Sequence, residues 1–259
     1  MSDPIVIIGL GEIGGVFARG FLKLGHPVFP VTRHSDLNAA ARGVPDPLLV
    51  LVAVAESDLA TVLAHMPPPW RDRLGLVQNE LLPLDWQAHG IERPTVMSLW
   101  FEKKKGQDYK VLVPSPVFGP NAKVMIDGLA ALEIPAWKVA SEQELLFELV
   151  RKNLYILTTN IAGLVTGGTV QELWEKHQPL ARSVADEVLA IQFALIGQEL
   201  DRNALLDGML AGFAGDPAHK CMGRTAPARL ARALAQAGQF GIATPKLQEI
   251  AHRAERGQR

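Results

Sequence analysis

A short glycine pattern close to the start of the chain constrains the fold more than any other feature. Residues 4–8 form an apolar, β-branched run, which predicts a buried strand. Gly9, Gly11 and Gly14 follow it with the spacing G-x-G-x-x-G, and residues 12–24 then show a helical pattern. A strand, a loop of this kind and a helix in succession predict the first βα unit of a Rossmann fold.

Each glycine of this loop has its own expected role. Gly9 permits the tight turn out of the strand, Gly11 lets the backbone approach a diphosphate, and Gly14 lets the helix pack closely on the sheet. A diphosphate would lie at the helix N-terminus, where N–H groups and the helix dipole attract an anion. The alternative is a glycine turn that serves only packing. The predicted dinucleotide-binding loop consists of Gly9, Leu10, Gly11, Glu12, Ile13 and Gly14.

The residues after the second predicted strand, 27–31, indicate which dinucleotide binds. An NAD enzyme usually has an acidic residue there for the ribose hydroxyls, but this chain has Thr32 followed by Arg33. A cation suits the 2′-phosphate of NADPH, so we expect NADPH in preference to NADH, held by Thr32 and Arg33. Arg33 as a solvated loop residue is the alternative. We expect this strand to be buried, and Pro30 is unusual in a buried strand because proline removes a ladder hydrogen bond.

The pattern of elements changes near residue 140. Before it, short apolar runs alternate with helical segments, which predicts a parallel sheet. After it only helical patterns occur, beginning with a long helix that Ser141 and Glu144 start with capping-box spacing. We predict an α/β Rossmann domain over residues 1–138 and an all-α domain over residues 139–259. Further predicted strands span 48–54, 74–77, 95–99 and 110–113, and further predicted helices span 57–65, 141–165, 169–176, 179–196, 202–213 and 226–237.

Composition excludes several classes of function. The formal net charge of −1 offers no electrostatic footprint for a nucleic acid. A single cysteine, Cys221, excludes an internal disulfide and fits a reducing cytoplasm. No apolar run suits a membrane helix, and the first strand begins too early for a signal peptide. The histidines lack metal-ligand spacing. We expect a cytoplasmic protein with a small-molecule substrate, no membrane partner and no metal. Its apolar helical half is typical of a homodimer interface, although the sequence leaves the oligomeric state open.

Three further motifs accompany the glycine loop. Gln78 and Asn79 follow the fourth predicted strand, Lys152 is followed eight residues later by Asn160, and Glu187 lies on the next long helix. Together these motifs resemble the ketopantoate reductase (2-dehydropantoate 2-reductase) family, whose Rossmann domain is followed by a helical domain like that of 6-phosphogluconate dehydrogenase. The resemblance implies that Lys152 is the general acid, that Asn79 and Asn160 position substrate and nicotinamide, and that Glu187 supports the lysine or the substrate.

A physical argument for Lys152 stands beside the resemblance. Reduction of a ketone requires a hydride and a proton, and a partly desolvated lysine can polarise the carbonyl and donate the proton. Asn160 is about 80° from Lys152 around an ideal helix, so both side chains can line one side of a site. Lys152 as a surface lysine, Asn79 as a turn residue and Glu187 as a solvated acid are the alternatives.

The chain also departs from the family pattern. A second asparagine four residues after the lysine is replaced by Ile156, and a glycine after the Gln-Asn pair by Glu80. A lysine after the third strand is replaced by Ala55, and a substrate-binding glutamate near the C-terminus by Ala226. These losses weaken the case for ketopantoate itself as the substrate.

Two remaining segments are rich in cations. In residues 219–225, Lys220 or Arg224 is a candidate for binding a substrate carboxylate, although a solvated loop is the simpler interpretation. Residues 103–105 are three lysines, which we interpret as an exposed turn between strands.

The leading hypothesis is an NADPH-dependent reductase of a small 2-oxo acid or a related carbonyl compound. One alternative keeps the cofactor but reduces an imine, as in opine or pyrroline-carboxylate chemistry. Another is a non-catalytic NADP-binding sensor that has lost the groups for its substrate.

Overall fold

A computed structural model describes residues 3–257, and the chain divides into two compact units, Met1–Leu149 and Val150–Arg259. The division falls inside helix α6 (Glu142–Thr166), whereas the boundary predicted from the sequence precedes that helix. The first unit is an α/β structure and the second is helical, which confirms the predicted fold class. Because α6 contributes to both units, each unit is described by itself.

The first unit is built on a seven-stranded sheet with the order β2-β1-β3-β4-β5-β8-β9. The first five strands in this order are parallel, as predicted. The predicted parallel sheet also has one antiparallel pairing, because β8 runs antiparallel to β5, and β9 pairs parallel with β8. The strands are β1 (Ile5–Ile8), β2 (Val28–Val31), β3 (Leu49–Val52), β4 (Leu74–Leu76), β5 (Thr95–Met97), β8 (Ser115–Phe118) and β9 (Ala136–Lys138).

A separate antiparallel hairpin consists of β6 (Phe101–Lys103) and β7 (Tyr109–Val111). The candidate strand predicted at residues 110–113 therefore belongs to this hairpin and not to the main sheet. Lys103 is the last residue of β6, so only the two lysines after it lie in the exposed turn that was predicted for all three.

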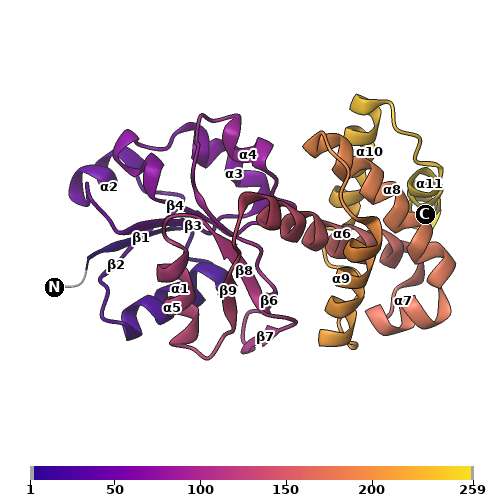
Figure 1. The fold of residues 1–259 in the computed structure, drawn as a ribbon, viewed down its shortest axis with the longest axis horizontal. Helices are drawn as coiled ribbons and strands as arrows, with labels where there is room; N and C mark the ends of the chain where they lie inside the picture. The colour runs from indigo at the N-terminus through magenta and orange to yellow at the C-terminus, as the bar shows by residue number, and fades with distance from the viewer. Residues whose placement is uncertain (1–2, 258–259) are drawn as a thin grey trace. The chain divides into compact units, whose positions relative to one another are not determined.

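Helices cover both faces of the sheet, with α1 and α5 on one side and α2, α3 and α4 on the other (Figure 1). Helices α1 and α5 meet at Gly20 and Gly128, where a Cβ atom on Gly20 would lie 2.0 Å from the Gly128 carbonyl oxygen. Phe17, Phe21 and Met125 are fully buried in the core beneath them. The helices of this unit are α1 (Glu12–Lys23), α2 (Leu37–Gly43), α3 (Glu56–Ala64), the short 3-10 helix η1 (Pro68–Arg73), α4 (Pro83–Gln87) and α5 (Ala122–Ala130).

The position of β2 explains its proline. β2 is an edge strand that pairs only with β1, and Pro30 is exposed on it opposite Ile7. An edge strand tolerates proline because the missing N–H group leaves no neighbouring strand without a hydrogen-bond donor. The buried strand expected from the sequence is thus an edge strand.

Up to residue 257, the second unit contains the rest of α6 and five further helices. Ser141 caps α6, because its Oγ accepts a hydrogen bond from the Glu144 amide at 3.1 Å. Asn153 on α6 donates to Gln192 on α8 at 2.9 Å, and both side chains are buried. Among residues 3–257 no helix is long and apolar enough to cross a bilayer. The further helices are α7 (Val170–Lys176), α8 (Gln178–Ile196), α9 (Arg202–Gly215), α10 (Ala226–Phe240) and α11 (Pro245–Gly257).

Candidate functional site

The order of the parallel strands locates a ligand-binding edge in the first unit. β2 lies on one side of β1 and β3 lies on the other, so the chain reverses its direction of travel across the sheet between β1 and β3. Ligands of open α/β sheets bind outside the carboxyl ends of the strands at such a switch point. The glycine loop follows β1 directly and therefore lies at this point.

The three glycines of the loop have different surroundings. Gly9 has a φ of +93°, and a Cβ there would lie 2.9 Å from the backbone of Ala53. A Cβ on Gly14 would lie 2.1 Å from the Gly9 carbonyl oxygen, so close packing of α1 excludes any side chain. A Cβ on Gly11, by contrast, would have no atom within 4 Å. The loop therefore leaves open space at Gly11, where a diphosphate is expected to approach the backbone.

The start of α1 suits an anion. Gly11 is the N-cap of this helix and provides no side chain to cap it. The first N–H groups of a helix have no partner within the helix, and the dipole gives this end a partial positive charge. The loop and the helix start thus fit the diphosphate of a dinucleotide.

One cavity, of about 760 Å³, extends from the glycine loop toward the end of β2. Thr32 and Ser35 form a turn there, with the Ser35 amide donating to the Thr32 carbonyl at 3.0 Å and the Thr32 amide donating to Ser35 Oγ at 3.1 Å. Arg33 and His34 are exposed at the tip of this turn and line the cavity, and Asp58 lines it from α3. The cavity has the place and the lining expected for the adenosine half of a dinucleotide.

A second cavity, of about 340 Å³, lies on the other side of the glycine loop. The loop between β3 and α3 borders both cavities, because Ala53, Val54 and Ala55 line each of them. Asn79, to which the resemblance assigns a role in positioning substrate and nicotinamide, lines the second cavity after β4. The full lining is Glu12, Ile13, Ala53, Val54, Ala55, Glu56, Val77, Gln78, Asn79, Leu99, Phe101, Glu102 and Lys103.

The residues on either side of Asn79 fix its position. Gln78 is buried and its Nε2 donates to the carbonyl of Val52 at 2.8 Å, which ties the end of β4 to β3. Glu80 has a φ of +58°, in the left-handed region that glycine adopts without strain. The chain therefore keeps at Glu80 the backbone conformation that a glycine would favour, although the residue differs from the family pattern.

The other predicted site residues belong to the second unit. Lys152 is half-buried on α6, with its Nζ 6.0 Å from the centre of the Tyr155 ring. Asn160 is half-buried two turns later, where its Nδ2 donates to the Ile156 carbonyl at 2.9 Å and its Oδ1 accepts from the Gly223 amide at 3.2 Å. Asn160 thus attaches the loop before α10 to α6.

Glu187 contacts the start of the last helix. Its two carboxylate oxygens accept hydrogen bonds from the amides of Lys246 and Leu247 at 2.8 and 2.9 Å. Both amides lie in the first turn of α11, so the carboxylate satisfies groups that the helix cannot pair internally. These contacts give Glu187 a structural role in addition to the supporting role that the resemblance implies.

The two main departures from the family pattern lie at buried apolar positions. Ile156 on α6 is 6% exposed, and Ala226 at the start of α10 is fully buried. Each side chain packs in the helical unit where the family pattern has a polar group.

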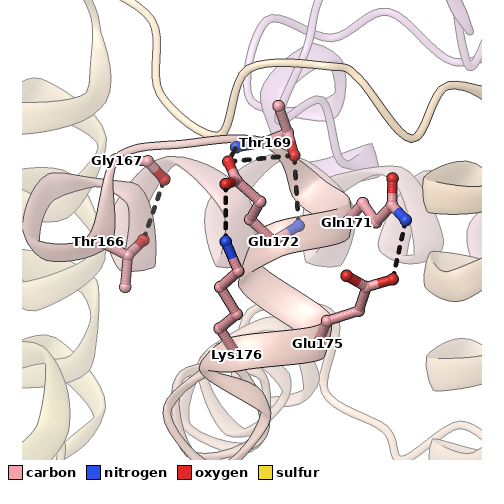
Figure 2. A network of polar contacts seen from close by, with 7 residues as sticks. All are labelled: Thr166, Gly167, Thr169, Gln171, Glu172, Glu175 and Lys176. Carbon is pink, nitrogen blue, oxygen red and sulfur yellow. Dashed lines mark hydrogen bonds and ion pairs between the residues drawn. The ribbon is translucent and has the colours of Figure 1, made fainter.

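The donor-rich segment of residues 219–225 is attached to the start of α7. The Val170 amide donates to the His219 carbonyl at 2.9 Å, and the Cys221 amide donates to the Gly168 carbonyl at 3.1 Å. Figure 2 shows the network that orders this helix start, in which Thr169 and Glu172 form a capping box. Lys220 and Arg224 are exposed. The segment is thus hydrogen-bonded to the start of α7 near its N-terminal end, whereas its cationic side chains are exposed to solvent.

Cys221 in this segment is a packing residue. The Cys221 side chain is fully buried, and a Cβ placed on Gly163 would lie 2.8 Å from the Cβ of Cys221. Burial, together with the nearby carboxylate of Glu172, raises the pKa of the Cys221 thiol to about 11, although the ammonium of Lys220 acts in the opposite direction. A thiol with this pKa is protonated at neutral pH and is a poor nucleophile.

Two polar groupings at these sites do not follow from sequence motifs. The Nζ of Lys103 lies 3.1 Å from a carboxylate oxygen of Glu12 in the second cavity. In the helical unit, Oδ2 of buried Asp216 lies 3.7 Å from Nδ1 of His219. The His219 ring packs edge-on against the Tyr155 ring. The side chains of a strand alternate between its two faces, so a strand at residues 101–103 would predict that Lys103 shares a face with buried Phe101. No local signal predicts the second grouping, which depends on the path of a loop.

Comparison with known proteins shows the class of fold. No protein-family model matches the sequence, and no curated protein matches it closely enough to be counted as a relative. Solved structures do match over nearly the whole chain, and they include ketopantoate reductases and D-mandelate dehydrogenase.

Three of these structures illustrate the similarity. 2-Dehydropantoate 2-reductase from Methylococcus capsulatus aligns with a TM-score of 0.72 and 14% identity, over 98% of this chain and 96% of its own. Dimeric ketopantoate reductase from Staphylococcus aureus aligns with a TM-score of 0.67 and 17% identity, over 97% of both chains. D-Mandelate dehydrogenase in complex with NADH aligns with a TM-score of 0.69 and 13% identity, over 98% of both. At these identities the comparison shows that the chain has the ketopantoate reductase fold.

Proposed function

We propose that this chain is an NADPH-dependent reductase of a small 2-oxo acid or a related carbonyl compound. The observation that carries the proposal is the pair of adjoining cavities around the glycine loop, at the switch point of the sheet. The chain that forms this sheet has the same fold as ketopantoate reductases. One cavity suits an adenosine phosphate and the other suits a nicotinamide. D-Mandelate dehydrogenase, which shares the fold, is known in complex with NADH.

Each predicted site residue has its own role in the proposed reduction. Gly9, Gly11 and Gly14 admit the diphosphate to the N-terminus of α1, and Arg33 faces the 2′-phosphate. Asn79 positions the nicotinamide side of the site. When bound, the reduced nicotinamide supplies a hydride to the carbonyl carbon, and Lys152 Nζ donates the proton that the carbonyl oxygen needs.

Binding and turnover measurements test the proposal. We expect calorimetry to show NADPH binding more tightly than NADH, and NADPH to be consumed with at least one member of a panel of 2-oxo acids. Binding without turnover of any carbonyl compound or imine would favour the sensor, which the apolar residues at Ile156 and Ala226 support. Failure to bind either dinucleotide would contradict the proposal as a whole. Sedimentation of the same sample tests the homodimer that we also propose.

Reduction of an imine is a second candidate function, favoured by the charge of the second cavity. Its lining contains the carboxylates of Glu12, Glu56 and Glu102 and the ammonium of Lys103, and Lys104 pairs with Glu102 at 3.0 Å from outside the lining. These three carboxylates and two ammonium groups carry a net charge of −1, so the lining is weakly acidic. An acidic lining favours a positively charged iminium over the carboxylate of a 2-oxo acid. Turnover of cyclic or secondary imines in the same panel, with inert 2-oxo acids, would identify this activity.

A further inference from the structure

An ion pair lies beside the glycine loop, in the cavity that suits the nicotinamide. Glu12 is the first residue of α1 and directly follows Gly11, and its Oε2 lies 3.1 Å from Lys103 Nζ. The side chain of Lys103 is only 18% exposed, and that of Glu12 is 42% exposed. Both residues line the cavity.

The hairpin holds Lys103 in this position. Alternate residues of a strand point to the same face, so Lys103 shares the face of Phe101. The Phe101 ring lies 6.4 Å from that of Phe17 on α1, and 6.4 Å from that of Tyr109 on β7. Lys103 Nζ also donates to the Lys104 carbonyl at 3.0 Å. The ammonium is therefore fixed against the start of α1 by packing on the same helix that carries Glu12.

Glu12 creates an electrostatic problem for a dinucleotide. Its carboxylate is at the helix N-terminus, which is also where a diphosphate should bind. The same N–H groups and dipole that attract a phosphate attract this carboxylate. Without a counter-charge, Glu12 would both occupy those groups and repel the diphosphate.

We propose that Lys103 is a positioning residue for dinucleotide binding. It neutralises Glu12 and holds the carboxylate toward the hairpin, which leaves the N-terminus of α1 to the diphosphate. This inference rests on the proposed function, because it requires that a dinucleotide binds at the loop. It adds a residue from a hairpin outside the main sheet to the residues that control cofactor affinity.

A double-mutant cycle tests the inference with NADPH as the probe. We expect Lys103→Met to weaken NADPH binding about tenfold in calorimetry, because an uncompensated carboxylate then faces the diphosphate. In a Glu12→Gln background the same change should alter the affinity by less than about twofold, since no charge remains to be compensated. Lys105→Met removes the same charge from an exposed position of the hairpin turn and should bind NADPH like wild type.

Three outcomes would overturn the inference. An equal loss in both backgrounds would mean that Lys103 contacts the ligand directly, and no loss in the wild-type background would mean that the pair has no role in binding. A matching loss for adenosine 2′-monophosphate, which lacks the diphosphate, would mean that the substitution disturbs the whole site. If wild type bound neither NADPH nor NADH, the proposed function itself would fail. Wild-type binding with an unaffected Lys103→Met variant would overturn only the role of Lys103.

Discussion

At the scale of single residues, Gly11 and Gly14 lie three positions apart, but we expect Gly11 to be needed for ligand binding and Gly14 for close packing. Gly11→Val places its side chain in open space, so we expect the fold to keep its thermal stability while dinucleotide binding is lost. Gly14→Ala places a Cβ 2.1 Å from a carbonyl oxygen and should cost about 1–3 kcal/mol of stability. Calorimetric titration and thermal unfolding measure the two effects. Unchanged NADPH affinity in Gly11→Val would contradict the dinucleotide site.

Arg33 decides which dinucleotide is preferred, if it meets the 2′-phosphate as proposed. Arg33→Ala should then weaken NADPH binding by about 1–3 kcal/mol, the usual size of a hydrogen bond to a charged group. The affinity for NADH, which lacks that phosphate, should change little. Arg42→Ala is a matched control, because Arg42 is an exposed arginine on α2 outside the cavity lining. An equal fall for both dinucleotides would mean that Arg33 acts on the structure of the turn.

Cys221 should resist alkylation in the folded protein. A thiol pKa of about 11 leaves about a hundred times less thiolate at pH 8 than a thiol with the ordinary value of 9.0. The unfolded chain releases this proton at lower pH than the folded protein does, so stability should fall as pH rises from about 9 to 11. Iodoacetamide labelling and unfolding curves of wild type and Cys221→Ala measure both effects. Rapid labelling under native conditions would contradict the buried environment.

At the scale of elements, the sequence pattern predicted most helices of the second unit better than the strands at the sheet edge. The long helix at residues 141–165 is confirmed as Glu142–Thr166, because its cap and its apolar positions are local signals. β8, β9 and the hairpin were missed or misplaced, since strands of three or four residues provide too few positions for periodicity. Helices α2, α4, α5 and α11 were also missed, and the start of α11 is supported by Glu187, a residue distant in sequence.

The contact between Glu187 and α11 predicts a loss of stability. Glu187→Ala removes the acceptor of two backbone amides and should cost about 1–3 kcal/mol in urea unfolding. Glu187→Gln keeps one acceptor oxygen and should cost less. Asp186→Ala, at the exposed neighbouring position, is the control. Loss of turnover without loss of stability would instead indicate the role at the reaction centre that the resemblance implies.

At the scale of the whole molecule, the proposed reaction needs a dinucleotide held by the first unit and a proton donor from the second. Lys152→Met keeps the apolar stem but removes the charge and the proton. Turnover should fall by about 10²–10⁴, the usual contribution of a positioned acid, while NADPH affinity stays near that of wild type. Lys176→Met, on α7, is a control for a lysine paired on the helix surface. Turnover at the wild-type rate would show that Lys152 is an ordinary helix residue.

The sequence by itself determined the Rossmann start, the change to helices near residue 140 and the glycine loop, because each depends on signals within a few consecutive residues. It also indicated that Gly11 differs from its neighbours, and the structure adds that open space surrounds only that glycine among the three. The roles that the resemblance implies for Asn79, Lys152 and Asn160 stay predictions.

The tertiary structure decided which side chains meet. β2 is an edge strand, which makes Pro30 acceptable, and this depends on the order of strands that are distant in sequence. The pairing of Glu12 with Lys103 depends on the folding of a hairpin back onto α1, and the contact of Glu187 with α11 joins residues about 60 positions apart. Sequence patterns report the neighbours of a residue along the chain, whereas ion pairs and caps of this kind depend on packing between elements, which no local pattern contains.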